Sequence, residues 1–124
     1  MRGRWPAALA LVACATITDV GADVLARRPA SALLATCEAV SGVPAETVAE
    51  ARCLAFIEGF VWGHGWAQWR RSSDMYFCLP DNEDVDARAL VPVIVAYLRS
   101  HPERIDQPAH LMLFAALTSA YPCR

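Results

Sequence analysis

The sequence predicts an all-α fold, a small single-domain bundle of about four to five helices stapled by two disulfides. Apolar residues recur at helical spacing in four segments, and no segment alternates apolar and polar residues as a strand does. Hydrophobic residues make up 56% of the 124 residues, which excludes a disordered chain. The net charge is -2 and no basic stripe is present, so the composition argues against nucleic-acid binding.

Residues 1–22 have the pattern of a secretory signal peptide. Two early arginines precede a short apolar run, and small residues up to Ala22 suit cleavage. The run is shorter than the ~20 apolar residues that span a bilayer, so we expect no membrane span. We therefore expect an exported domain of residues 23–124. Two alternatives stay open: a lipoprotein box, LVAC, that places a lipid anchor on Cys14, and an uncleaved N-terminal helix.

The cysteine count supports the disulfides. Removal of the leader takes away Cys14 and leaves four of the five cysteines. An even number in an exported domain of about a hundred residues is typical of a disulfide framework. Four cysteines allow three connectivities, and the sequence alone does not choose among them. The alternative, a cytosolic protein with four buried thiols, depends on the leader. The four residues are Cys37, Cys53, Cys78 and Cys123.

The first two helices are expected over residues 29–42 and about 44–70. Pro29 suits a first helical turn, and Gly42 is a common residue after a helix end. The second helix is the longest of the four.

The last two helices are expected at about 86–100 and 106–121. Pro92 lies inside the third segment, so that helix either kinks there or begins near residue 90. Asp106 is expected to cap the fourth helix. The predicted buried face of the fourth helix consists of Leu111, Phe114, Leu117 and Tyr121.

The stretch GFVWGHGWAQW holds three of the four tryptophans of the chain. At 100° per residue, Trp62, Trp66 and Trp69 fall on one side of the second helix, and His64 falls on the other. A helix that is apolar on two sides is either buried or faces a partner. Two interpretations stay open: the tryptophans pack in the core, or they form an interface with a second copy or another protein.

Other residues of this helix and of the loop after it are weaker candidates. The glycine pair Gly59 and Gly63 is expected to let a neighbouring helix approach closely. His64 is expected to be a hydrogen-bonded core residue. A hydrolase that uses Glu58 and Asp74 has little support, because the chain has no nucleophile motif and its histidines lack metal-ligand spacing. We therefore predict no catalytic residue, no metal site and no cofactor.

Several marks along residues 30–123 together resemble the Rap/Tai-type immunity proteins of bacterial type VI secretion. They are a helical cysteine before a glycine-containing aromatic segment, an FCLP element, a YLRSHPE helix end, a PA helix start and a terminal PC. Each mark alone is weak, whereas their order and spacing are specific. The residues that carry the resemblance are Cys53, Gly59, Phe77, Cys78, Pro80, Tyr97, Leu98, His101, Pro102, Glu103, Pro108, Ala109, Pro122 and Cys123.

The resemblance implies a small all-α periplasmic protein that binds a peptidoglycan-amidase toxin, often as a homodimer, and occludes its catalytic cleft. It also implies the disulfides Cys37–Cys53 and Cys78–Cys123. If the resemblance holds, the loop after the second helix would enter that cleft beside the tryptophan face. The partner-binding residues would then be Trp62, Trp66, Trp69, Arg70, Arg71 and Asp74.

One stretch departs from the family pattern. WGHGWAQW stands where the family commonly has a shorter, less aromatic run, often with an aspartate. The resemblance therefore predicts the fold better than it predicts a particular toxin. The alternative function is a non-enzymatic cell-envelope interaction or structural protein with the same fold.

Overall fold

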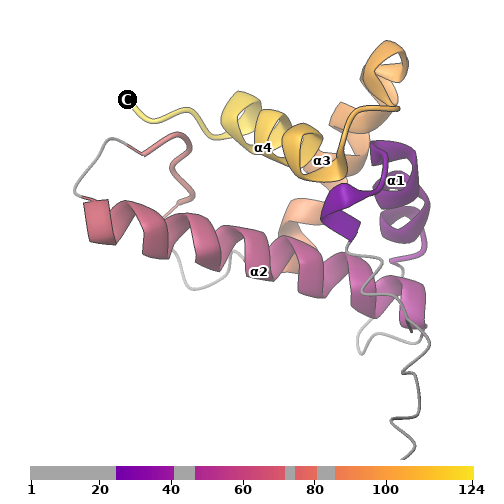
Figure 1. Ribbon diagram of the computed structural model, residues 1–124, viewed down its shortest axis with the longest axis horizontal. Coiled ribbons are helices and arrows are strands. Elements are labelled where there is room, and N and C mark those ends of the chain that lie inside the picture. Colours follow the sequence, from indigo (N-terminus) through magenta and orange to yellow (C-terminus); the bar gives the residue numbers. More distant parts are fainter. Residues whose placement is uncertain (1–24, 41–46, 72–74, 81–85) are drawn as a thin grey trace, which may run out of the picture.

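Four α-helices and two short 3-10 turns make up the part of the chain that the computed structural model describes, residues 25–40, 47–71, 75–80 and 86–124 (Figure 1). No strand is present in these ranges, so the predicted all-α fold is confirmed. The predicted signal peptide and Cys14 lie outside the described residues. The elements are η1 (Leu25–Arg27), α1 (Ala30–Glu38), α2 (Val48–Arg71), α3 (Ala87–Ser100), η2 (Pro102–Arg104) and α4 (Ala109–Ala120).

Side chains just before α2 and α3 fix where these helices begin. The hydroxyl of Thr47 accepts a hydrogen bond from the backbone N–H of Glu50 at 3.1 Å. The carboxylate of Asp86 accepts one from the N–H of Ala89 at 2.9 Å. Each bond satisfies an amide that has no partner within its own helix. α3 continues through Pro92, so the alternative start near residue 90 is wrong.

The predicted start of the fourth helix is also wrong. Asp106 lies in the turn that follows η2, and α4 begins only at Ala109. The reason is a backbone pairing with the segment before α1. Arg28 accepts a hydrogen bond from the Ala109 N–H at 2.8 Å, and the N–H of Ala30 donates to Gln107 at 2.8 Å. These bonds hold the chain extended up to Pro108.

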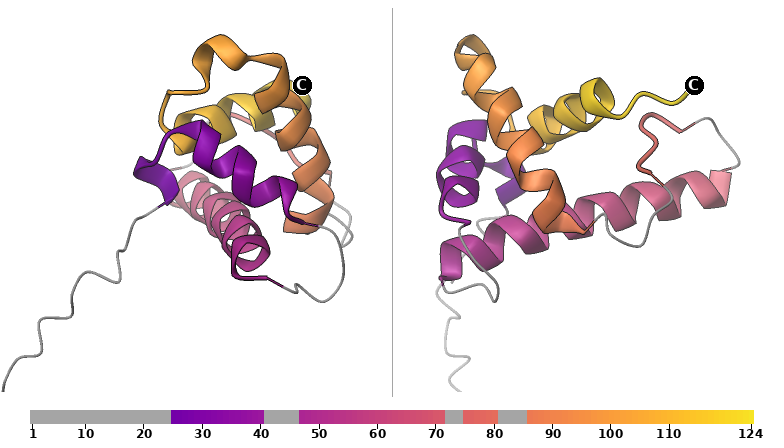
Figure 2. Two further views of the ribbon diagram at one scale, coloured as in Figure 1. Left: turned by 90° about the vertical axis from the view of Figure 1, so that its right-hand side faces the viewer. Right: turned by 180° about the vertical axis from the view of Figure 1, so that it is seen from behind.

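The core lies where α1, α3 and α4 pack over the first half of α2 (Figures 1 and 2). Of the predicted inward face of α4, Leu117 is buried and Phe114 and Tyr121 are partly buried against the core, as expected, but Leu111 is exposed. Met112, which was not predicted, is buried. The fully or nearly fully buried hydrophobic residues are Ala30, Leu33, Cys37, Cys53, Ile57, Phe77, Leu90, Val91, Ile94, Leu98, Ala109, Met112, Leu113, Ala116 and Leu117.

Both implied disulfides are present. Cys37–Cys53 joins α1 to α2 inside the core, with Cα atoms 5.1 Å apart. Cys78–Cys123 joins the segment of residues 75–80 to the C-terminus, with Cα atoms 5.0 Å apart. The first disulfide is buried, whereas Cys78 is exposed. The two bonds therefore staple different regions of the molecule.

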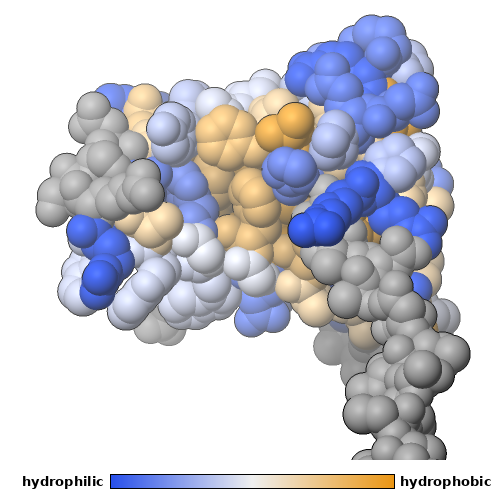
Figure 3. Space-filling view, in the orientation of Figure 1, coloured by the Kyte–Doolittle hydropathy of each residue, from blue (hydrophilic) through white to orange (hydrophobic). Residues whose placement is uncertain are grey.

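The second half of α2 extends beyond the other helices. α2 has 24 residues and is about 36 Å long. Figure 1 and the right-hand view of Figure 2 show the C-terminal end of α2 reaching past α1 and α3, with the segment of residues 75–80 lying between it and the end of α4. The space-filling view shows an apolar band over the middle of the molecule and a paler surface toward this end of α2 (Figure 3). Here the helix has a side that no other described helix covers.

Candidate partner-binding surface

The three tryptophans of α2 lie on the surface. Their exposed fractions are 74% for Trp62, 63% for Trp66 and 71% for Trp69. Spacings of four and three residues place them on one side of the helix. The rings of Trp66 and Trp69 lie 5.1 Å apart and are tilted by 37°. The interpretation that these side chains pack in the core is therefore wrong, and the interface interpretation remains as a proposal.

The opposite side of the same helix packs on the segment of residues 75–80. The His64 ring stacks on Phe77 with centroids 4.0 Å apart, and Phe77 is almost fully buried. His64 is not the hydrogen-bonded residue we expected, since its buried Nε2 has no partner among the described residues. Burial lowers the pKa of the His64 imidazole because desolvation penalises the charged form.

The glycines of this half of α2 do not serve close packing within the chain. A Cβ atom added at Gly59, Gly63 or Gly65 would meet nothing within 4 Å. The predicted close approach of a neighbouring helix at Gly59 and Gly63 is therefore wrong for the described residues. The space that a side chain would occupy at these positions is therefore empty.

The segment of residues 75–80 covers the side of α2 opposite the tryptophans. Its backbone is fixed to the chain end, because the N–H of Cys78 donates a hydrogen bond to Tyr121 at 2.8 Å beside the disulfide. Met75 and Tyr76 are 45% and 62% exposed. The sequence analysis did not predict that these two side chains are exposed. Their position directly before the FCLP element could have indicated that they lie near the predicted partner-binding loop.

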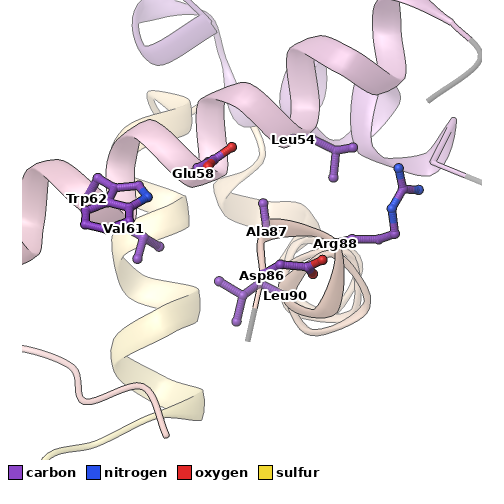
Figure 4. A pocket seen from close by; sticks show the side chains of 8 residues that line it. All are labelled: Leu54, Glu58, Val61, Trp62, Asp86, Ala87, Arg88 and Leu90. Atoms are coloured by element: carbon purple, nitrogen blue, oxygen red, sulfur yellow. The ribbon is translucent and has the colours of Figure 1, made fainter. Parts of the chain in front are cut away.

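Two hollows flank Val61 on α2. One, of about 490 Å³, lies between α2 and the start of α3 (Figure 4). The other, of about 460 Å³, lies between α2 and the segment of residues 75–80, and His64 and Met75 line it. We call the first hollow the α2–α3 groove. Its lining residues are Leu54, Glu58, Val61, Trp62, Asp86, Ala87, Arg88 and Leu90.

The predicted polar residues are only partly placed. Arg70 is exposed at the end of α2. The side chain of Arg71 and the whole of Asp74 lie outside the described residues. The distance between Glu58 and Asp74 is therefore not defined by the described residues. Within the described ranges, no group of three or more histidine, cysteine, aspartate or glutamate residues is arranged to hold a metal ion.

A charge pair at the edge of the α2–α3 groove was not predicted. Glu50 is completely buried, and Arg88 donates a hydrogen bond from Nη1 to its Oε1 at 3.3 Å. A buried carboxylate requires such compensation. In the sequence, Glu50 is a glutamate in the first turn of a helix, and a glutamate at such a position is usually exposed. Only the packing of α3 against α2 explains its burial.

These features define a small disulfide-bonded helical domain with an exposed aromatic surface. Residues 30–123 match the family model of Rap1a immunity proteins, so the chain belongs to that family. Membership indicates a role in toxin immunity with a toxin protein as partner, and such proteins are generally not enzymes. No curated protein and no solved structure matches the chain. No described helix is long and apolar enough to cross a membrane.

Proposed function

We propose that this protein binds a peptidoglycan-amidase toxin of type VI secretion in the periplasm and occludes its catalytic cleft. One observation carries the proposal: in a chain of the immunity family, three neighbouring tryptophans are exposed on a helix that extends beyond its bundle. Occlusion requires only binding, so the protein needs no reaction of its own.

The exposed aromatic surface suits a protein interface. A tryptophan side chain offers a large area and loses little rotamer freedom when it is covered, so tryptophans dominate many interfaces. The α2 surface carries three of them within eight residues, from Trp62 to Trp69. A cluster of exposed aromatic side chains typically marks an interaction site, because a partner that covers it removes apolar surface from water. The tryptophans are therefore the proposed anchor of the complex.

The loop after α2 is the proposed element that enters the cleft. Arg70 is exposed at the point where this loop begins. Arg71 and Asp74 follow it in sequence. Two arginines next to an aspartate offer charge-assisted hydrogen bonds to both signs of charge on a toxin surface. The proposal assigns these residues to recognition rather than to catalysis.

Export is the second part of the proposal. Two disulfides form and persist in oxidising compartments such as the periplasm. They agree with a cleaved signal peptide at residues 1–22. The alternative, a lipid anchor on Cys14, gives a different mature N-terminus. Intact mass of protein purified from the envelope distinguishes a chain that starts near Asp23 from one that starts at an acylated Cys14.

The decisive experiment identifies the neighbouring genes and uses any amidase toxin that they encode. Purified toxin is assayed on peptidoglycan with and without the protein, and cells that direct the toxin to the periplasm are scored for lysis. We expect stoichiometric inhibition and protection by the wild type. Trp66→Ala should weaken both, whereas Leu111→Ala, which removes a 48% exposed side chain from α4, should keep both.

Failure of binding and inhibition by the wild type would reject the immunity proposal. A deletion strain with an envelope defect but unchanged toxin sensitivity would instead support the alternative function, a structural envelope protein of the same fold.

Homodimer formation is the other assembly that the proposal includes. The uncovered side of α2 is a described apolar surface on which two copies can meet. If a second copy covers the same tryptophans that bind the toxin, the two assemblies compete. Sedimentation velocity of the protein alone and with toxin tests this directly. Trp66→Ala should then lower the dimer fraction as well as toxin affinity.

A further inference from the structure

The α2–α3 groove lies beside the exposed tryptophans and carries an excess of negative charge. Glu58 on α2 and Asp86 before α3 are both exposed lining residues (Figure 4). Neither forms an ion pair with the described residues. The positive charge in the lining, Arg88, is already paired with the buried Glu50 at 3.3 Å. Asp86 accepts a hydrogen bond from the backbone N–H of Ala89, but neither groove carboxylate is paired with a positive side chain among the described residues.

The rest of the lining is apolar or aromatic. Leu54, Val61 and Leu90 are buried or half-buried side chains of the groove. Trp62 stands at its edge with 74% of its surface exposed. The groove thus combines an apolar lining, an exposed aromatic ring and two exposed carboxylates. Its volume of about 490 Å³ is ample for one long side chain.

We infer that the α2–α3 groove binds an arginine side chain that the toxin presents. Of the natural side chains, arginine matches this combination best. Its aliphatic part packs on apolar residues, its planar guanidinium stacks on an indole ring, and its five N–H groups donate to carboxylates. A lysine ammonium donates as well but lacks the planar face.

The chain just before the groove strengthens the electrostatic argument. The sequence DNEDVD, residues 81–86, places three further acids within five residues of Asp86. Charges close in sequence to Asp86 raise the negative potential that a basic partner meets on approach. The acidic run then steers the partner, and its last residue, Asp86, also caps α3. The inference rests on the proposed function only for the source of the arginine, because the groove itself belongs to this chain.

The first test uses a small probe and needs no toxin. Acetyl-arginine methylamide is titrated into labelled protein, with the uncharged isostere acetyl-citrulline methylamide as the matched control. We expect saturable shifts of the Trp62 indole and of the Leu54 and Leu90 methyl signals, with a roughly millimolar Kd. The citrulline probe should bind at least severalfold more weakly. Equal shifts with both probes, or no saturable shift, would overturn the inference.

The second test measures toxin affinity. Glu58→Gln removes an exposed charge, and Asp86→Asn removes the other charge while keeping a side chain that caps helices well. Each should weaken toxin binding about tenfold at low salt, since a charge-assisted hydrogen bond is lost. The matched control, Glu103→Gln with Asp106→Asn, removes two exposed acids from the turn between α3 and α4. It should change affinity less than about threefold, because neither acid lies in the groove.

The two tests separate this inference from the proposed function. If the wild type binds toxin and the groove variants bind equally well, the groove is not the arginine site and the immunity proposal stands. If the wild type does not bind toxin, the immunity proposal fails, and the arginine probe still decides whether the groove binds a guanidinium group.

Discussion

Both halves of α2 are rich in apolar residues, but the surroundings of these residues differ. In the first half, Cys53 and Ile57 are completely buried in the core, where α1 and α3 pack against α2. In the second half, Trp62, Trp66 and Trp69 are between 63% and 74% exposed. One helix thus supplies core residues at one end and an uncovered aromatic surface at the other.

This contrast separates stability from recognition along one continuous helix. Burial of the first half contributes to the free energy of folding, because apolar area leaves water. The tryptophan side of the second half contributes little to folding and remains available for a partner. Because both halves belong to the same rigid helix, the bundle fixes the orientation of the tryptophans. Substitutions in each region test whether the division is as sharp as the structure indicates.

The disulfides should give the largest effects on stability. In a chain-entropy model, loss of Cys78–Cys123, with a sequence separation of 45, costs about 4 kcal/mol. Loss of Cys37–Cys53, with a separation of 16, costs about 3 kcal/mol. Urea unfolding of the two paired cysteine-to-serine variants measures both costs. Under mild reductant, the bond with the exposed Cys78 should also open first.

A different order of reduction would contradict the contrast between the two bonds. If the Cys37–Cys53 bond opened first, the first half of α2 would be more accessible than its burial indicates. Mass spectrometry after alkylation of the freed thiols gives the order directly.

A pair of alanine variants tests the two halves of α2 against each other. Ile57→Ala leaves a cavity in the core and should lower the free energy of unfolding by about 2–5 kcal/mol. Trp66→Ala should change it by about 0.5 kcal/mol or less, because the side chain is largely exposed. It should weaken toxin binding by about 2 kcal/mol, near thirtyfold. Urea unfolding and calorimetric titration give the two quantities.

The opposite result for Trp66→Ala would indicate that the tryptophans stabilise the fold and do not bind the toxin. A large loss of stability in Trp66→Ala with unchanged toxin affinity would mean that the second half of α2 is part of the core in solution.

The helices could be predicted from the sequence because their evidence is local. Helical spacing placed α2 and α3 within a few residues of their observed bounds, and the family resemblance implied the correct disulfide pairs. Prediction failed where the answer depends on distant segments. Asp106 is a good capping residue, yet a backbone pairing near Arg28 delays α4 until Ala109. Helical spacing showed that the tryptophans share one side of α2, but only tertiary packing shows that no described helix covers that side.

The glycines of α2 should give an intermediate effect of the opposite sign. Glycine inside a helix costs about 1 kcal/mol relative to alanine, and a Cβ atom added at Gly63 would meet nothing within 4 Å. Gly63→Ala should therefore raise the free energy of unfolding by about 0.5–1 kcal/mol. Urea unfolding measures it, and toxin titration shows whether the glycine serves the complex. A stabilised variant with weakened binding would mean that the partner approaches the backbone at Gly63.

His64 should give the smallest effect, visible as a pH dependence. Its pKa is lowered below the usual 6.5 by burial, so the folded chain binds fewer protons at this site than the unfolded chain does. The resulting stability is complete above pH 6.5. It decreases as the pH falls below 6.5 and levels off once the pH is below the folded pKa. The buried Nε2 has no described hydrogen-bond partner, so a proton there gains no acceptor.

Replacement of His64 by phenylalanine isolates this contribution. The ring that stacks on Phe77 at 4.0 Å is kept as an aromatic group, and the titration is removed. Urea unfolding of both proteins between about pH 7.5 and about 4.5 should show a shallower slope for His64→Phe than for the wild type below pH 6.5. Because His64 packs against the segment of residues 75–80 at the C-terminal end of α2, acid should also loosen this end of α2 before the rest of the core. Equal slopes for the two proteins would mean that His64 is solvated and that the inner side of the second half of α2 is as open as its tryptophan side.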